Sequence, residues 1–293
     1  MSHDKEKKGY SDGHPLDAVH YREYKILLAP EPLASPRGFK DFAKVVRHAA
    51  ADLDVTLAPD PGAGEEFTTR EIVFYDTHNF DLYNHAFILR KRTLFAKGFP
   101  TGDPELALKF RHVDIDTAAQ VDIRPLDRAG FRVKFKEELL PEHDKVGGIR
   151  SLYSHNCVIV TPEVHLDPSV KNITTTFPAL QQIELSGRKV ALVNHVAIEE
   201  VLTELGTLDF GHGVRAKANV ALWRRRADQK PLIGEFGFQC KFDRDDERHD
   251  KAKKHTEKFF TAFQHLIKDQ VLLGVTKTRV VYGLGPGAVT NRE

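Results

Sequence analysis

Cysteine and long apolar runs are scarce in this sequence of 293 residues, and both absences exclude classes of protein. The two cysteines, Cys157 and Cys240, lie far apart, so the chain has neither a disulfide framework nor a thiolate zinc cluster. No apolar run is long enough to cross a bilayer, and the N-terminus lacks the apolar segment of a signal peptide. We therefore expect a cytoplasmic protein that has no membrane partner.

Net charge is also nearly absent, since 43 Lys and Arg balance 42 Asp and Glu, for a formal charge of +1. A protein that binds nucleic acid polymers through bulk electrostatics needs a clear positive excess, so we expect no such partner. Charged residues still make up 29% of the chain and hydrophobic residues 41%, which is typical of a globular protein. Any basic surface must be local and balanced elsewhere. The oligomeric state is left open.

Alternation of polar and apolar residues is the most informative pattern. In the clearest stretch, residues 131–136 (FRVKFK), three apolar residues alternate with three cations. Because the strand period is two, such a stretch has one apolar face and one charged face. For a single strand, a solvated outer face is the ordinary interpretation. Repeated over six stretches, the pattern predicts a barrel or deeply curved sheet whose concave side holds a polyanion.

Two amphipathic helices are expected outside this sheet. The first begins after Ser35, a good N-cap, with Pro36 at the first helical position. The second spans about 250–268. Their apolar stripes are Phe39, Phe42, Val46 and Ala49 or Ala50 on the first helix, and Phe259, Phe263 and Ile267 or Leu266 on the second.

Four motifs, taken in order, resemble those of the CYTH superfamily, also called the triphosphate tunnel metalloenzymes. They are Glu23-x-Lys25; FYDT at 74–77 followed by LRKR at 89–92; LALKFR at 106–111; and IGE at 233–235 with a closing TKT at 276–278. Their order and spacing make the assignment specific, although each motif alone is weak. The resemblance covers about 20–112 and 200–283.

The resemblance implies an α+β fold, namely an antiparallel β tunnel (a closed or C-shaped barrel) with helices packed on the outside. We expect a single tunnel domain over 21–283, between a flexible tail at 1–20 and a second tail at 284–293. The section of about 140–195 is longer than in a typical member. Short strands of unassigned order are expected there, at 157–160, 183–185 and 190–193.

The resemblance also implies chemistry, because members hydrolyse or cyclise triphosphates with Mg²⁺ or Mn²⁺. The leading hypothesis is divalent-metal-dependent hydrolysis of inorganic triphosphate or a small organic triphosphate. Two alternatives stay open: a class IV-type adenylyl cyclase, and a non-catalytic module that binds polyphosphate or a nucleotide. In each case the partner is a small polyanion.

Cations at alternating strand positions give the candidate substrate site. Arg suits bidentate contact with phosphate oxygens, and Lys acts as a compact charge. The cations expected to bind phosphate are Lys25, Arg90, Arg92, Lys109, Arg111, Lys134, Lys136, Arg215, Lys217 and Lys277. The structural alternatives are ion pairing across the sheet and, for Lys134, Lys136, Arg215 and Lys217, exposure to solvent.

Glu23 and Glu235 are the expected metal ligands, because hard divalent cations prefer carboxylate oxygens. The metal would orient a water for in-line attack on phosphorus, with Glu23 and Lys25 as catalytic residues. An ion pair with a neighbouring cation is the alternative for each acid. Two positions depart from the family pattern, since Tyr21 and Gly237 replace acids. Either other acids substitute (Glu105, Asp114, Glu138, Glu184 or Glu204), or metal binding is weakened and the chain binds without much turnover.

Overall fold

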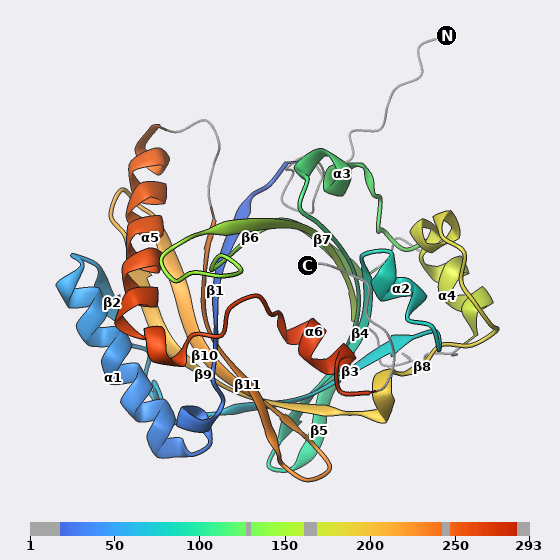
Figure 1. Ribbon diagram of the computed structural model, residues 1–293, viewed down its shortest axis with the longest axis horizontal. Coiled ribbons are helices and arrows are strands. Elements are labelled where there is room, and N and C mark those ends of the chain that lie inside the picture. Colours follow the sequence, from blue (N-terminus) through green and yellow to red (C-terminus); the bar gives the residue numbers. More distant parts are fainter. Residues whose placement is uncertain (1–17, 127–129, 161–168, 242–246, 286–293) are drawn as a thin grey trace.

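The computed structural model describes residues 18–126, 130–160, 169–241 and 247–285. The two expected tails lie almost wholly outside these ranges. The main element is a closed β barrel, seen end-on in Figure 1 with helices around its outside. The prediction of an α+β barrel with outer helices is confirmed.

Nine strands of the described chain form the barrel. They are β1 (Tyr21–Leu28), β3 (Thr68–Asp76), β4 (Phe87–Ala96), β5 (Phe99–His112), β6 (Phe131–Leu140), β7 (Arg150–Val160), β9 (Ile198–Asp209), β10 (Arg215–Arg225) and β11 (Pro231–Lys241). Their order is β9-β10-β11-β1-β6-β7-β5-β4-β3, and β3 pairs with β9 to close the ring. Two short strands, β2 (Thr56–Ala58) and β8 (Ala191–Leu192), pair with β9 and β3 respectively.

One neighbouring pair, β1 with β6, is parallel, and every other pair is antiparallel. The expected antiparallel tunnel is thus confirmed as a mixed barrel, with the β1–β6 pair as its parallel exception. A closed ring in which every neighbour runs in the opposite direction needs an even number of strands. Because this ring has nine, at least one pair has to be parallel.

The long section at 140–195 contributes to the barrel wall itself. Strand β7 lies between β6 and β5, and α4 (Val170–Thr176), a 3₁₀ turn (Pro178–Gln182) and β8 follow. The expected strand at 183–185 is wrong. Ile183 and Leu185 instead pack as irregular chain against the apolar cluster outside β4 and β5.

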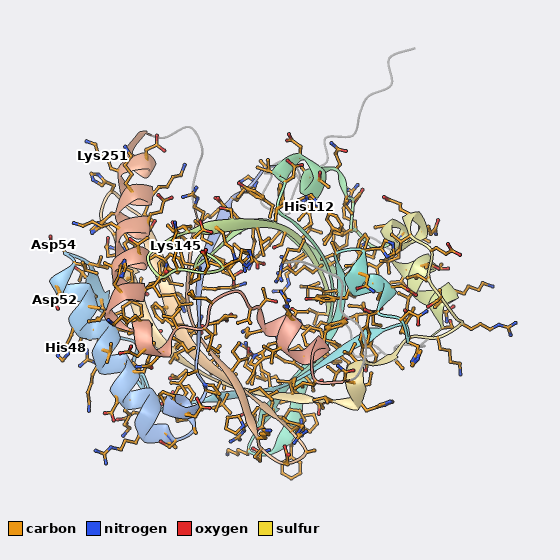
Figure 2. All side chains as sticks on the ribbon, in the orientation of Figure 1. His48, Asp52, Asp54, His112, Lys145 and Lys251 are labelled. Atoms are coloured by element: carbon orange, nitrogen blue, oxygen red, sulfur yellow. The ribbon has the colours of Figure 1, made fainter. Side chains whose placement is uncertain are left out.

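Helices α1 (Pro36–Asp52) and α5 (Glu247–Leu266) cover one side of the barrel (Figure 1). Ser35 caps α1, since its Oγ accepts the Gly38 N–H at 3.2 Å. The predicted stripes of both helices are buried against the outward side of β11, and Ile267 rather than Leu266 completes the second. Polar side chains such as His48, Asp52 and Lys251 cover the helices' outer surface (Figure 2).

The remaining helices are short: α2 (Asp81–Asn84), α3 (Ile115–Gln120), α6 (Lys277–Tyr282), and 3₁₀ turns at Glu31–Leu33, Val193–His195 and Lys268–Gln270. Helix α6 lies across one end of the barrel (Figure 1). In the part of the chain that the structure describes, no helix has the length and apolar character needed to span a membrane. Both cysteines are buried and free.

Inward-facing residues change from charged to apolar along the strands as the barrel approaches α6. Beneath α6, Val281 and Tyr282 pack with one inward residue from each of five strands: Leu27, Ile72, Ile88, Ile198 and Ile233. Two residues away on the same five strands stand Lys25, Arg70, Arg90, Glu200 and Glu235, which line a cavity. The apolar layer is the floor of that cavity, so the bore is closed at the α6 end.

Candidate functional site

A cavity of about 370 Å³ occupies the charged layer of the barrel. Its ionisable lining consists of ten cations (Lys25, Arg70, Arg90, Arg92, Lys109, Arg111, Arg132, Lys134, Lys136 and Lys277) and five carboxylates (Glu23, Glu105, Glu138, Glu200 and Glu235). Eight of the ten predicted phosphate ligands are among these cations, and both predicted metal ligands are among the carboxylates. The charges of the lining do not balance, so the cavity has a marked positive excess.

Arg215 and Lys217 do not line the cavity, contrary to the prediction. They share the inward face of β10 with Asn219, which does line it, because the core residues Ala216 and Ala218 occupy the opposite face. They lie at the beginning of the strand, beyond the cavity, where both are exposed. The Arg215 side chain is 71% exposed and pairs with Asp209 at 3.0 Å. The alternation of polar and apolar residues predicted that both side chains are on the inward face of β10, but it did not predict how far the strand extends past the cavity.

Glu138 on β6 is the centre of the most buried charge cluster, being only 1% exposed. It accepts from Lys109, and its Oε2 lies 3.2 Å from Arg111 and 3.3 Å from Lys25. The Ser154 hydroxyl adds a hydrogen bond of 2.8 Å. Burial alone would raise the pKa of this carboxyl, but the three cations outweigh burial and hold it well below its ordinary value.

Glu23 on β1 belongs to a neighbouring group of charges nearer the start of the strand. Its Oε2 lies 3.0 Å from Lys25 and 3.2 Å from Lys136, and Lys136 also donates to Gln239 at 2.8 Å. Burial opposes ionisation of Glu23, but Lys136 and Lys25 together lower its pKa. The carboxylate is therefore ionised and already paired.

A further cluster of charges, around Lys277, lies just above the apolar floor. Lys277 Nζ is 2.6 Å from Glu235 and 3.6 Å from Glu200, and 4.6 Å from the centre of the Trp223 ring. Glu200 also accepts the indole N–H of Trp223 at 2.8 Å and pairs with Arg70 at 3.1 Å. Burial works against the charge on Glu200, but Lys277 and further cations hold its pKa at about 2.

Arg90, Arg92 and Lys109 form the part of the lining where the positive charge is least compensated. In the described ranges Arg90 forms no ion pair, and burial and then Arg92 lower its pKa. The Nε atom of Arg92 is buried without a hydrogen-bond partner. Burial and Arg111 lower the pKa of Lys109 to about 7 in spite of its contact with Glu138. Since guanidinium groups stay protonated in proteins, the charge of this wall favours an anion.

Among the acids that could substitute for the missing ones, only Glu105 and Glu138 line the cavity. Asp114 caps α3 outside the barrel, Glu184 is exposed, and Glu204 lies outside the lining.

Sequence reasoning missed Arg70, Glu200 and Trp223. Arg70 and Glu200 stand two residues from Ile72 and Ile198, just as Lys25 stands two residues from Leu27, and this repeated spacing is the signal that identifies them.

The expected metal ligands do not fit one divalent cation. In the β1–β11 register Glu23 is opposite Gln239 and Glu235 is opposite Leu27. That offset of four residues corresponds to about 13 Å along the strands. All five cavity carboxylates contact Lys or Arg. Nowhere in the described chain do three Asp, Glu, His or Cys side chains gather as metal ligands.

The two departures from the family pattern have different surroundings. The ring of Tyr21 lies under Lys134, with Nζ 4.7 Å from its centre. Gly237 is opposite Lys25 in the ladder, and a Cβ atom there would come within 3.2 Å of the Tyr24 carbonyl oxygen. In place of one acid, this chain has the Tyr21 ring, which contacts Lys134. In place of the other it has Gly237, which is closely packed against the neighbouring strand β1.

The closed barrel, its outer helices and its cationic bore define the described chain as a β-barrel protein with a charged central cavity, the architecture that the sequence resemblance implies. No protein-family model matches the chain, and no curated protein matches it. Among solved structures it is similar to HpAC1 from Hippeastrum, proposed as an adenylyl cyclase and described as having a dominant triphosphatase activity (11% identity, 92% of this chain and 98% of that chain, TM-score 0.40).

It is also similar to the PH1819 protein from Pyrococcus horikoshii OT3 (10% identity, 82% of this chain and 89% of that chain, TM-score 0.33). A third similar structure is a proposed adenylate cyclase from Bacillus halodurans (12% identity, 89% of this chain and 98% of that chain, TM-score 0.40). At these identities and TM-scores the likeness carries no argument about function, which rests on the residues of the cavity.

Proposed function

We propose that the cavity binds a linear triphosphate or polyphosphate, either inorganic or carried by a small organic group. The observation that carries this proposal is the excess of cations over carboxylates in the cavity lining, together with Arg90, which has no ion pair among the residues described. Desolvated cations are costly unless an anion neutralises them. A chain of phosphates supplies several negative charges in a row, which matches cations arranged along several strands.

The shape of the cavity supports a small ligand that enters from one side. Its volume of about 370 Å³ suits a small molecule. The floor below Lys277 is closed, whereas the Arg132 side chain is 62% exposed. A phosphate chain would therefore enter from the Arg132 side, and an organic group attached to it would stay on that side.

The cyclase alternative receives no support from the cavity. A nucleotide cyclase needs a surface that recognises the base, commonly an aromatic ring. The one aromatic residue of the described lining is Trp223, and Lys277 covers the face of its ring.

Hydrolysis with Mg²⁺ or Mn²⁺ stays a prediction. The paired carboxylates do not fit a resident divalent cation, so we assign no catalytic step to Glu23, Lys25 or Glu235. The geometry supports binding of the polyanion, with turnover as a separate question for assay.

Fluorescence of Trp223, the single tryptophan of the chain, gives a direct test. Tripolyphosphate should change the emission in a saturable manner, and Arg90→Gln should weaken this binding by about tenfold or more, the effect of losing a charge-assisted contact. Arg215→Gln, outside the cavity, is the matched control and should bind normally. Phosphate release from tripolyphosphate, ATP and thiamine triphosphate, with and without Mn²⁺, separates turnover from binding. Absence of saturable binding for all of these ligands would overturn the proposal.

A further inference from the structure

Two carboxylates from different strands converge on one cation just above the floor of the cavity. Glu235 comes from β11 and Glu200 from β9, with β10 between them, and Lys277 Nζ lies 2.6 Å from the first and 3.6 Å from the second. Carboxylate oxygens from separate elements around one positive centre resemble the ligand set of a hard divalent cation. Here the positive centre is the ammonium group of the chain itself.

Helix α6, which carries this ammonium, is capped at its start and bound to another segment at its end. Thr276 caps the helix by accepting the Arg279 N–H at 3.1 Å. At the other end, the side-chain amide of Asn194 donates to the carbonyl groups of Val281 and Tyr282 at 2.8 and 3.0 Å. Because Thr276 closes the first turn and Asn194 holds the last, Lys277 projects from an ordered helix rather than from a loose tail.

Two of the groups that contact Lys277, namely Glu200 and Trp223, have further partners of their own. Glu200 is held from its other side by Arg70 at 3.1 Å and by the Trp223 indole at 2.8 Å, and the Trp223 ring lies beside the ammonium. A divalent cation entering here would have to displace Lys277 while adding charge to a lining that already has more cations than carboxylates. Electrostatic repulsion would oppose that exchange.

We infer that the Lys277 ammonium takes the place of a divalent cation between Glu200 and Glu235, so that a phosphate chain binds here without a resident metal ion. The inference concerns how the cavity is neutralised and rests on the proposed polyphosphate binding. It makes Lys277 both the permanent counter-ion of the two carboxylates and a cation at the closed end of the cavity.

Removing the ammonium should uncover a metal site. We would titrate Mn²⁺ alone into the wild type, Lys277→Ala and Lys277→Gln, following bound metal by electron paramagnetic resonance. The wild type should bind Mn²⁺ weakly, and the two variants should bind one ion at least about tenfold more tightly. Adding Glu235→Gln to Lys277→Ala should abolish the gain. Lys217→Ala, exposed outside the cavity, is the matched control and should behave as the wild type.

Phosphate binding provides the second arm. Tripolyphosphate affinity of the wild type should change less than about twofold when EDTA replaces Mg²⁺. A stoichiometric Mn²⁺ site in the wild type, no Mn²⁺ gain in either Lys277 variant, or loss of tripolyphosphate binding in EDTA would each overturn the inference. The Mn²⁺ titration contains no phosphate, so its outcome is distinguishable from a failure of the proposed function, which would appear as no tripolyphosphate binding under any condition.

Discussion

The hydroxyl group of Tyr282 donates a hydrogen bond of 2.9 Å to Asp76 Oδ2, which joins the last helix to the end of β3. The two carboxylate oxygens of Asp76 also accept the N–H groups of Leu82 and Tyr83 at 2.9 and 3.0 Å, and the ring of Tyr83 stacks on that of Tyr282. The acid of the FYDT motif is therefore outside the cavity lining. It anchors α6, which closes the floor.

Asp76 should give the protein a measurable dependence of stability on pH. Burial outweighs its hydrogen bonds and raises the pKa of Asp76 to about 6. Because this folded-state pKa lies above that of an unfolded aspartate, the folded protein takes up a proton first as the pH falls. The contribution of Asp76 to the free energy of unfolding should thus decrease as the pH rises from about 4 to about 6.

The comparison that isolates this contribution is urea unfolding of the wild type and Asp76→Asn at intervals between these pH values. The carboxyl groups with lowered pKa values are common to both proteins, so the difference between the two curves reports Asp76. The free energy of unfolding of the wild type, relative to that of Asp76→Asn, should decrease as the pH rises. Parallel curves would show that Asp76 titrates as an ordinary aspartate.

Glu138 should be the carboxylate on which folding depends most. Glu138→Gln leaves Lys109, Arg111 and Lys25 without the charge that they share, and breaking a buried ion pair in this way costs about 3–5 kcal/mol. Glu105→Gln is the matched control, because its pairs with Arg92 and Arg132 are partly exposed, and it should cost less than about 1 kcal/mol. Chemical denaturation measures both.

Tripolyphosphate should restore part of the stability that Glu138→Gln loses, since a bound polyanion supplies the missing negative charge. Equal losses in the Gln variants of Glu138 and Glu105 would contradict the central position given to Glu138. So would a loss in Glu138→Gln that tripolyphosphate leaves unchanged.

Lys109 should make phosphate binding depend on pH. Its pKa of about 7 means that the cation is lost as the pH rises through neutrality, and a bound polyanion would raise that pKa. The wild-type affinity should therefore fall by about tenfold between pH 6 and pH 8 relative to Lys109→Arg, whose guanidinium stays charged. Ionisation of the ligand is the same in both titrations and cancels. Superimposable pH profiles would contradict the prediction.

Local sequence signals predicted the parts of the fold that depend on local physics. Ser35 and Pro36 mark the start of α1, and seven of the expected cations lie on strands and line the cavity, whereas Lys277 reaches it from helix α6. Arg215 and Lys217 were misplaced because alternation carries no information about where along a strand a cavity ends.

The remaining features depend on contacts between distant segments. A ring of nine strands needs a parallel pair, but neither the number of strands nor the β1–β6 pairing is recorded in any single motif. The cavity floor combines Leu27 with Tyr282, residues at opposite ends of the chain. The pairing of Lys277 with Glu200 and Glu235 appears only once α6 is placed across the barrel.

Calorimetric titration of the wild type and Arg90→Gln with orthophosphate, pyrophosphate and tripolyphosphate tests the central claim most directly. Wild-type affinity should increase with each added phosphate and fall with added salt, since each phosphate meets further cations. Arg90→Gln should bind tripolyphosphate about 10- to 100-fold more weakly without loss of unfolding free energy, because Arg90 has no ion pair to lose in the described structure. Tripolyphosphate binding no tighter than orthophosphate binding, or undiminished in Arg90→Gln, would contradict the account.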